Sequence, residues 1–182
     1  AEQLTLETLS DHLSDLADLI LAQTLRCCWA NINQRHREQP AFAIIGYGKL
    51  GGKELGYASD LDIIFLYEDD HDSAGELYAK LAKRINTWLT TLTPAGMLYE
   101  VDLRLRPNGS SGLLVSSIAA FDHYQKNEAW LWEHQALTRA RYVAGDTTVA
   151  ERFAEIKREV LMLPRDQQKL REEVYAMRHK ML

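Results

Sequence analysis

The chain lacks several features that define whole classes of protein. It has only two cysteines, the adjacent Cys27 and Cys28, and no second pair that could complete a zinc site. No apolar run approaches the roughly 20 residues that a membrane span needs, and no basic start with a small-residue cleavage site marks a signal peptide. We therefore expect buried thiols in a reducing compartment, no contact with a membrane and a cytoplasmic location.

An excess of positive charge is also missing. The 21 Lys and Arg residues face 26 Asp and Glu residues, for a formal net charge of -5. This balance argues against non-specific nucleic-acid binding, which needs a basic face. A hydrophobic content of 46% and a charged content of 26% are ordinary for a soluble globular protein. We expect one domain with an appendage and no nucleic-acid partner.

The two ends predict that this is a piece of a longer protein. The chain starts at Ala1 without an initiator Met, and it stops at Leu182 inside a charged helical pattern. No Gly or Pro marks a helix end there.

The first fifth of the chain has the pattern of one long helix over residues 5–37, closed by Pro40. Apolar residues recur there in steps of three and four, which is typical of a helix packed against other helices. The predicted seam consists of Leu6, Leu9, Leu13, Leu16, Ile20, Gln23, Cys27 and Ala30.

The middle of the chain alternates short strands with a helix. Apolar runs predict strands at 41–45 and 60–67, joined through the glycine-rich turn 46–52. An amphipathic helix is expected at 74–92, and strict alternation predicts a third strand at 98–106 before the loop 107–112. From Ser117 onward the pattern is helical. The helix at 74–92 has an apolar stripe of Leu77, Leu81, Ile85, Trp88 and Leu92.

These elements predict an α+β fold with a small sheet and helices on both sides. We expect three segments: an N-terminal helical segment at 1–38, the core at 39–115 and a C-terminal helical segment at 116–182.

Asp60 and Asp62 are the first candidates for chemistry. They lie two residues apart on a predicted strand, so both carboxylates leave the same face about 7 Å apart. Carboxylates this close repel each other, and they precede an apolar run where unpaired charge is costly. A hard divalent cation such as Mg²⁺, which prefers oxygen ligands, removes both problems. Alternatively, one Asp caps a turn and the other is solvated.

The surroundings of this pair favour a metal site beside a polyphosphate. Gly51-Gly52 precedes it and lets backbone N–H groups approach phosphate, and Ser59 adds a hydroxyl. Asp102 supplies a third carboxylate from another predicted strand. Three carboxylates can hold two metal ions, one activating the attacking oxygen and one neutralising the leaving pyrophosphate.

Two arginines are expected on the same strand face as Asp102. Arg104 and Arg106 would offer forked donors to phosphate oxygens. The alternative is mutual salt bridging on an exposed face, which we prefer for Glu100.

The glycine-rich turn also has the spacing of a dinucleotide-binding loop, since Gly46, Gly48 and Gly51 follow a predicted strand. The next strand comes too soon to leave room for the long helix of that unit. The spacing of a P-loop is absent.

The residues from Gly48 to Asp62, GKLGGKELGYASDLD, resemble the DNA polymerase β-like nucleotidyltransferase superfamily, and within it the glutamine synthetase adenylyltransferase family. Two further stretches fit that family: 99–109, YEVDLRLRPNG, and 132–141, WEHQALTRAR. The resemblance covers nearly the whole chain. It implies a polymerase β-like core, with the long helix before it and a helical segment after it.

The resemblance also implies an activity. Members of the family contain two such domains, one moving AMP from ATP to a tyrosine of glutamine synthetase and the other removing it by phosphorolysis. This chain has one copy of the motif, and the sequence of that copy is more similar to the C-terminal, AMP-attaching half. The implied cofactors are two Mg²⁺ ions, or Mn²⁺, with ATP as substrate. The implied partners are glutamine synthetase and, through the full-length enzyme, the PII signal protein.

Roles follow for individual residues. Asp60, Asp62 and Asp102 would hold the metal ions, and Asp102 would help to activate the tyrosine hydroxyl. Gly51, Gly52 and Ser59 would position the β- and γ-phosphates, with Arg104 or Arg106 balancing charge. His134, Arg139 and Arg141 could reach the nucleotide or the protein substrate, or they are ordinary polar helix positions.

Three alternatives stay open. One is the phosphorolytic half of the same enzyme, and another is a helical docking module that keeps the core only as a scaffold. The third is a small-molecule nucleotidyltransferase of the antibiotic-modifying kind. The three carboxylates of Asp60, Asp62 and Asp102 argue against the docking module, because a domain without catalytic activity would not be expected to retain three charges that are costly to place together.

Overall fold

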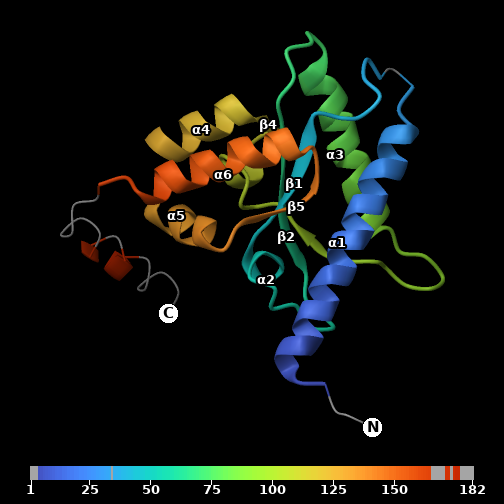
Figure 1. Ribbon diagram of the computed structural model, residues 1–182, viewed down its shortest axis with the longest axis horizontal. Coiled ribbons are helices and arrows are strands. Elements are labelled where there is room, and N and C mark those ends of the chain that lie inside the picture. Colours follow the sequence, from blue (N-terminus) through green and yellow to red (C-terminus); the bar gives the residue numbers. More distant parts are fainter. Residues whose placement is uncertain (1–3, 34, 165–170, 173, 177–182) are drawn as a thin grey trace.

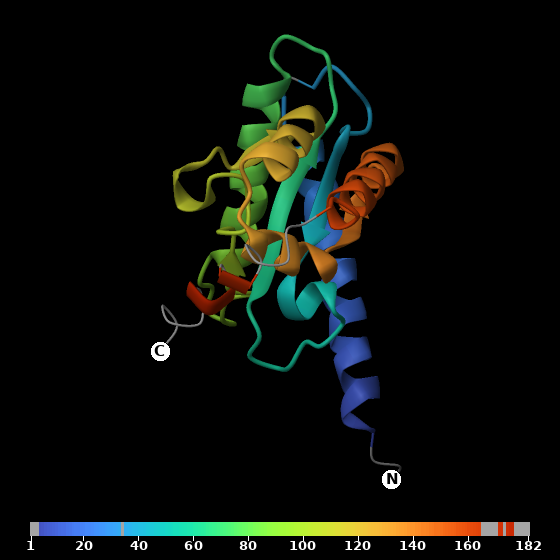
Figure 2. The same cartoon turned by 90° about the vertical axis from the view of Figure 1, so that its left-hand side faces the viewer.

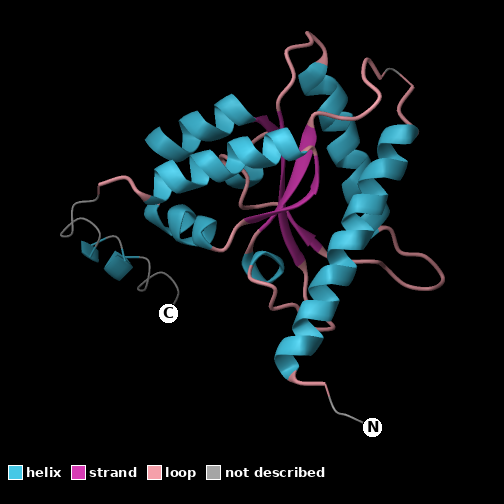
Figure 3. Cartoon of the chain, viewed as in Figure 1, coloured by secondary structure: helices cyan, strands magenta, loops and turns pink. Residues whose placement is uncertain are grey.

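A five-stranded mixed sheet lies at the centre of the protein, between two layers of helices (Figures 1 and 3). The computed structural model describes residues 4–33, 35–164, 171–172 and 174–176. The spatial order of the strands is β3-β2-β1-β5, and β4 pairs with β2 further along the same strand. The strands are β1 (Phe42–Gly46), β2 (Leu61–Tyr67), β3 (Val101–Asp102), β4 (Val115–Ser117) and β5 (Arg141–Gly145).

Strand direction makes the sheet mixed. β1 runs antiparallel to both β2 and β5, whereas β3 and β4 run parallel to β2. The predicted α+β class and the small mixed sheet, consistent with a polymerase β-like core, are confirmed.

Helices cover both faces of the sheet. In Figure 1, α1 and α3 lie on one side and α4, α5 and α6 on the other. A single turn of helix, α2, follows β1, and a 3₁₀ turn spans Gly109–Ser111. The helices are α1 (Leu6–Ala30), α2 (Gly48–Gly51), α3 (Ala74–Thr90), α4 (Ile118–Asn127), α5 (Leu131–Thr138) and α6 (Thr147–Leu161).

The two helical layers explain why the central strand β1 has no polar residue. Successive residues of a strand point to opposite faces. Phe42 and Ile44 of β1 pack with α1 and α3, while Ala43 and Ile45 belong to the core beneath α4–α6. All five residues of β1 are buried, so the strand carries no polar face.

The prediction for the first helix was wrong in two respects. α1 ends at Ala30 rather than at residue 37, because the Asn31 side chain and main-chain N–H both bond to the Cys27 carbonyl at its end. Its buried face is also not the predicted seam, since Leu6 is 78% exposed and Leu16 is 50% exposed. The residues that face the core are Ser14, Ala17, Leu21, Thr24, Leu25, Cys28 and Trp29.

The two cysteines differ in their surroundings. Cys28 is buried, and burial raises the pKa of its thiol to about 11. Cys27 is half-buried, so the expectation of two buried thiols holds fully for only one of them.

Three other predictions needed correction. The strand expected at 98–106 contains only Val101 and Asp102, because the chain turns beyond them. A fifth strand, β5, lies in the segment expected to be helical and pairs with β1. On α3 the apolar stripe fails at its end, where Trp88 is 46% exposed and Leu89 is buried instead.

No helix among the described residues is long and apolar enough to cross a membrane. The boundaries at residues 38 and 115 stay a prediction, although the sheet includes β5 from beyond the second of them.

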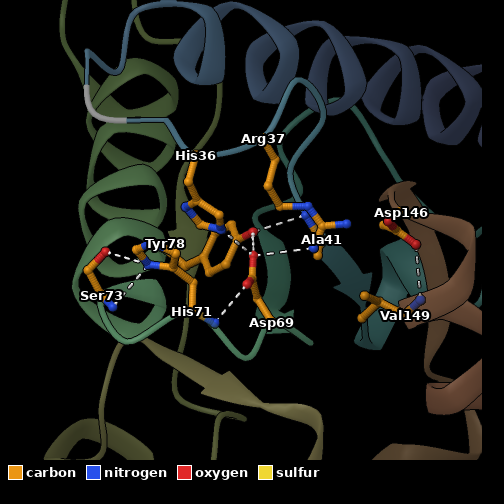
Figure 4. A network of polar contacts seen from close by, with 9 residues as sticks. All are labelled: His36, Arg37, Ala41, Asp69, His71, Ser73, Tyr78, Asp146 and Val149. Carbon is orange, nitrogen blue, oxygen red and sulfur yellow. Dashed lines mark hydrogen bonds and ion pairs between the residues drawn. The ribbon is translucent and has the colours of Figure 1, made fainter.

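A network of polar contacts lies just beyond the C-terminal end of β2 (Figure 4). The carboxylate of Asp69 is only 6% exposed, and it accepts hydrogen bonds from the Tyr78 hydroxyl at 2.7 Å and the His71 backbone N–H at 3.1 Å. His36 Nε2 lies 2.8 Å from it and Arg37 Nη1 3.3 Å. Burial alone would raise the pKa of Asp69, but these hydrogen bonds hold it well below its usual range.

We expect Asp69→Asn to lower the free energy of unfolding by about 1–3 kcal/mol at pH 7, because a buried, fully bonded anion is lost. A lowered carboxyl pKa contributes stability that is present above the ordinary value of 3.8 and is lost as the pH falls through the folded-state value. The advantage of the wild type in urea unfolding should therefore shrink below about pH 4. Asp70→Asn, at the exposed neighbouring position, should change stability by less than about 0.5 kcal/mol. Equal losses in both variants would contradict this account.

Candidate functional site

Three carboxylates meet at the end of the sheet where β2 begins. Asp62 and Asp102 are direct partners in the parallel register of β2 and β3, and Asp60 lies two residues before Asp62. One carboxylate oxygen from each of the three lies within 4.8 Å of the others. The predicted convergence of Asp60, Asp62 and Asp102 is thus present in the structure. It is the one group of three or more such side chains within the described residues that could hold a metal ion.

The charges of this cluster oppose one another. Asp62 is half-buried, and burial raises the pKa of its carboxyl, with further increases from the charges of Asp60 and Asp102. The positive charges of Arg104 and Lys49 act in the other direction. The arrangement concentrates negative charge where burial already disfavours it, which is the condition that a bound divalent cation relieves.

Asp102 is held by a neighbouring arginine. Arg104 Nε lies 3.1 Å from Oδ1 and 2.8 Å from Oδ2, and Arg104 Nη2 also donates to Oδ2. The main-chain N–H of Arg104 donates to Oδ1 at 2.8 Å. These bonds hold the pKa of Asp102 below its usual range. The Asp102 side chain is 15% exposed, whereas that of Arg104 is 77% exposed.

Gly48 forms the wall behind Asp62. Its φ of +51° lies in the left-handed region, and a Cβ built there would overlap the Oδ2 atom of Asp62. A glycine is therefore required for two reasons, backbone conformation and space. In the sequence, Gly48 belongs to a dinucleotide-binding spacing and opens the family motif, and neither pattern reveals this contact with Asp62.

Gly51 and Gly52 do not present open backbone donors. The N–H of Gly51 donates to the Tyr47 carbonyl at 2.7 Å, and that of Gly52 to the Gly48 carbonyl at 3.0 Å. A Cβ on either residue would overlap Arg139, the backbone carbonyl in one case and the guanidinium in the other. The contacts therefore show a structural role for both glycines, because they allow α2 to pack against Arg139, two residues before β5. Their contact with phosphate stays a prediction.

Ser59 closes the turn that leads into Asp60. Its Oγ accepts the Gly56 N–H at 2.9 Å, and its own N–H donates to the Gly56 carbonyl at 3.2 Å. Its predicted contact with phosphate is not tested by these bonds.

Arg106 does not share a strand face with Asp102 as predicted. Its guanidinium turns back into its own loop and donates to the carbonyls of Leu103 at 2.7 Å, Ser110 at 3.1 Å and Gly112 at 3.3 Å. Five-donor guanidinium groups suit this task, because one side chain can bind several carbonyls. Arg106 therefore organises the turn that replaces the predicted strand.

The three polar residues near the C-terminal segment join elements to one another. His134 Nε2 lies 2.8 Å from the Gln125 carbonyl of α4. Arg139 forms an ion pair with Glu54 in the loop after α2. Arg141 binds both oxygens of Asp18 on α1, at 2.8 and 2.9 Å, and the carbonyl of Leu50. The observed contacts favour a structural role for these three residues. Their contact with the nucleotide or the protein substrate stays a prediction.

An open pocket of about 370 Å³ lies beside the carboxylates. Figure 2 shows α2 and the loop before β2 at the same end of the sheet. A larger groove of about 610 Å³ lies between α3 and the segment that follows α1, but its lining contains no carboxylate, so the smaller pocket is the candidate site. The smaller pocket is lined by Asp60, Asn86, Glu100, Val101, Asp102, Leu103 and Arg104.

Two further residues escaped the sequence analysis. Asn86 of α3 lines the pocket, and nothing in the helical pattern distinguishes it. The charge of Lys49 partly offsets the rise that burial causes in the pKa of Asp62, and the place of Lys49 after Gly48 was the available signal.

Comparison with known proteins connects this geometry to a family. A family model described as glutamate-ammonia ligase adenylyltransferase matches residues 1–156. The chain is 65% identical over 178 residues to a bifunctional glutamine synthetase adenylyltransferase/adenylyl-removing enzyme of Chromobacterium violaceum, and 62% and 63% identical over 179 residues to enzymes of the same name from Nitrosomonas eutropha and Nitrosomonas europaea. These matches cover 98% of this chain but 19–20% of the relatives. The chain thus spans about a fifth of the length of the curated relatives it matches.

Proposed function

The chain belongs to the glutamate-ammonia ligase adenylyltransferase family, and we propose that it carries a nucleotidyltransferase site that moves AMP from ATP to a tyrosine of glutamine synthetase. The observation that carries the proposal is the convergence of Asp60, Asp62 and Asp102 beside an open pocket. The names of the relatives supply the protein substrate and both directions of the reaction.

The donor set suits hard divalent cations such as Mg²⁺ or Mn²⁺, and we propose that two bind. All three ligating groups are carboxylates, their oxygens converge, and Asp60 and Asp102 both raise the pKa of Asp62 beyond the effect of burial. Bound there, such ions would polarise the α-phosphate and neutralise the charge of the leaving pyrophosphate.

The chain's own residues supply the remaining steps. In the in-line displacement that we propose, the tyrosine oxygen bonds to the α-phosphorus while the bond from that phosphorus to the bridging oxygen breaks and pyrophosphate leaves. Asp102 accepts the proton of the tyrosine hydroxyl. Arg104, which lines the pocket, binds phosphate oxygens and balances the developing charge.

Other residues keep that geometry in place. Gly48 leaves room for the Asp62 carboxylate, and Arg106 fixes the loop that carries Arg104. Gly51, Gly52 and Ser59 form the approach to Asp60 and are our candidates for the β- and γ-phosphate side of the site.

The direction of the reaction rests on the resemblance of the sequence motif to the C-terminal half of the family. Regulation by the PII signal protein would act through the rest of the full-length enzyme, and a cytoplasmic location fits such a substrate. No nucleic-acid partner is part of the proposal.

The test is transfer of label from ATP labelled at the α-phosphorus. We expect the chain to label unmodified glutamine synthetase when Mg²⁺ or Mn²⁺ is present, with release of pyrophosphate. It should release little ADP from adenylylated glutamine synthetase supplied with phosphate. Asp60→Asn is the matched control and should remove the labelling while the chain stays folded.

The opposite pattern, ADP release without labelling, would move the chain to the AMP-removing half. If both activities are absent while ATP and metal ions still bind, the transfer reaction is not a property of this chain by itself. The rest of the protein would then be needed to dock the protein substrate.

A further inference from the structure

We propose that Arg104 and a divalent cation exchange at Asp102. The guanidinium holds the carboxylate until the cation binds, and the released guanidinium then takes up the phosphates of the nucleotide. This inference rests on the proposed function, and it assigns Arg104 a second role: a built-in competitor that couples the binding of the metal ion to the binding of ATP.

The competition follows from the contacts of Asp102. Arg104 donates to both carboxylate oxygens through Nε, at 3.1 and 2.8 Å, and to Oδ2 again through Nη2. A divalent cation shared with Asp60 and Asp62 needs a carboxylate oxygen of Asp102 as a ligand. The same oxygens cannot serve the full fork of donors and a cation together, so the binding of one weakens the binding of the other.

The side chain can leave without disturbing the backbone. The guanidinium side chain is 77% exposed, and no described residue other than Asp102 is an ion-pair partner of it. The main-chain N–H of Arg104 holds Asp102 Oδ1 at 2.8 Å independently of the side chain. Arg106 fixes the same loop through the carbonyls of Leu103, Ser110 and Gly112. The carboxylate therefore stays oriented when the guanidinium moves.

Electrostatics give the exchange a direction. The carboxylates of Asp102, Asp62 and Asp60 all stabilise the positive charge of Arg104 and raise its pKa. A cation among them supplies the charge that now comes from Arg104, so the attraction of the cluster for the guanidinium falls. Arg104 lines the 370 Å³ pocket, where a polyphosphate would offer it several oxygens in the forked geometry that it prefers. The one other acidic lining residue outside the cluster is the exposed Glu100.

The first measurement is the affinity for Mn²⁺ without nucleotide, followed by the electron paramagnetic resonance signal of the free ion. Arg104→Ala should bind Mn²⁺ about 3- to 10-fold more tightly than the wild type, because the competing cation is gone. Arg104→Lys should fall between them, since a single ammonium cannot hold both oxygens. Arg158→Ala removes the same charge at an exposed position of α6 and should match the wild type.

The second measurement is the affinity for a non-hydrolysable ATP analogue at saturating Mn²⁺. Arg104→Ala should bind the analogue about 10-fold more weakly, and Arg104→Lys should also be impaired, because a point charge does not reproduce the fork. The signature of exchange is the pair of opposite signs: tighter metal binding and weaker nucleotide binding in one variant. A residue that only supports the loop would weaken both.

The outcomes separate the exchange from the function beneath it. If the wild type binds Mn²⁺ and the analogue but Arg104→Ala binds Mn²⁺ no more tightly, the exchange is overturned and the metal site stands. If the wild type binds no Mn²⁺ with or without the analogue, the metal site fails, and the exchange fails with it.

Discussion

Replacement of Asp62 by Asn is expected to abolish the rise in melting temperature that Mn²⁺ with ATP gives to the wild-type chain. A ligand that binds only the folded state at 100 times its Kd stabilises it by about 2.7 kcal/mol. For a chain of this size that corresponds to a rise of about 5–10 °C. Asp62 is the carboxylate whose pKa responds to burial and to both other members of the cluster. Its loss should therefore remove nearly all of the increment, as measured by calorimetry.

Without metal the same variant should be as stable as the wild type or slightly more stable. The substitution removes a half-buried charge that Asp60 and Asp102 repel, so the folded state loses an unfavourable interaction. This combination, an intact fold with no response to metal, distinguishes a ligand from a residue needed for folding.

Glu100→Gln is the matched control for that experiment. Glu100 lines the same pocket and carries the same charge, but it is exposed and lies outside the carboxylate cluster. We expect this variant to keep the full metal-dependent increment. If Asp62→Asn keeps it as well, or if Glu100→Gln loses it equally, the cluster is not the site of metal binding.

The parts of the fold and site that could be predicted share a physical basis, short-range periodicity. Asp60 and Asp62 fall on one face because a strand has a period of two. The apolar runs of β1 and β2 identify buried strands because helices cover both faces of the sheet. Asp102 could be added because its neighbours Val101 and Leu103 continued the same alternation.

The same alternation also made the predicted strand at 98–106 too long. Residues 103–106 alternate as a strand would, yet Arg106 finds three carbonyls in its own loop and turns the chain instead. A local pattern does not reveal which carbonyls a guanidinium will meet. β5 was missed for a similar reason, since its place is set by pairing with β1 about a hundred residues away. The same holds for Arg141, whose contact with Asp18 joins β5 to α1, more than a hundred residues earlier in the chain.

The buried face of α1 shows what helical periodicity alone does not determine. The predicted seam and the observed buried face are both rows at helical spacing on one helix, and both contain apolar residues. Sequence alone cannot say which row meets the sheet. The choice depends on the approach of α3 and β5, the elements against which α1 packs.

Gly48→Ala should damage the site more than its small size suggests. Its Cβ would overlap Asp62 Oδ2, and the residue has a φ of +51°, a conformation that L side chains adopt at a cost of about 1–2 kcal/mol. The overlap must move the carboxylate or the start of α2. Displacement of a reacting group by about 1 Å can cost about 10²-fold in rate. We expect a loss of at least that size in AMP transfer, with the metal-dependent rise in melting temperature greatly reduced.

Gly109→Ala separates the two effects of that substitution. Gly109 has a φ of +53°, so its backbone cost should match that of Gly48, but a Cβ there would lie 3.6 Å from the Arg104 carbonyl, an ordinary contact. Both variants should lose about 1–2 kcal/mol of stability in urea unfolding. Only Gly48→Ala should lose the response to metal. Equal responses to metal in the two variants would mean that the contact between Gly48 and Asp62 has no part in shaping the site, and that the glycine is required for backbone conformation alone.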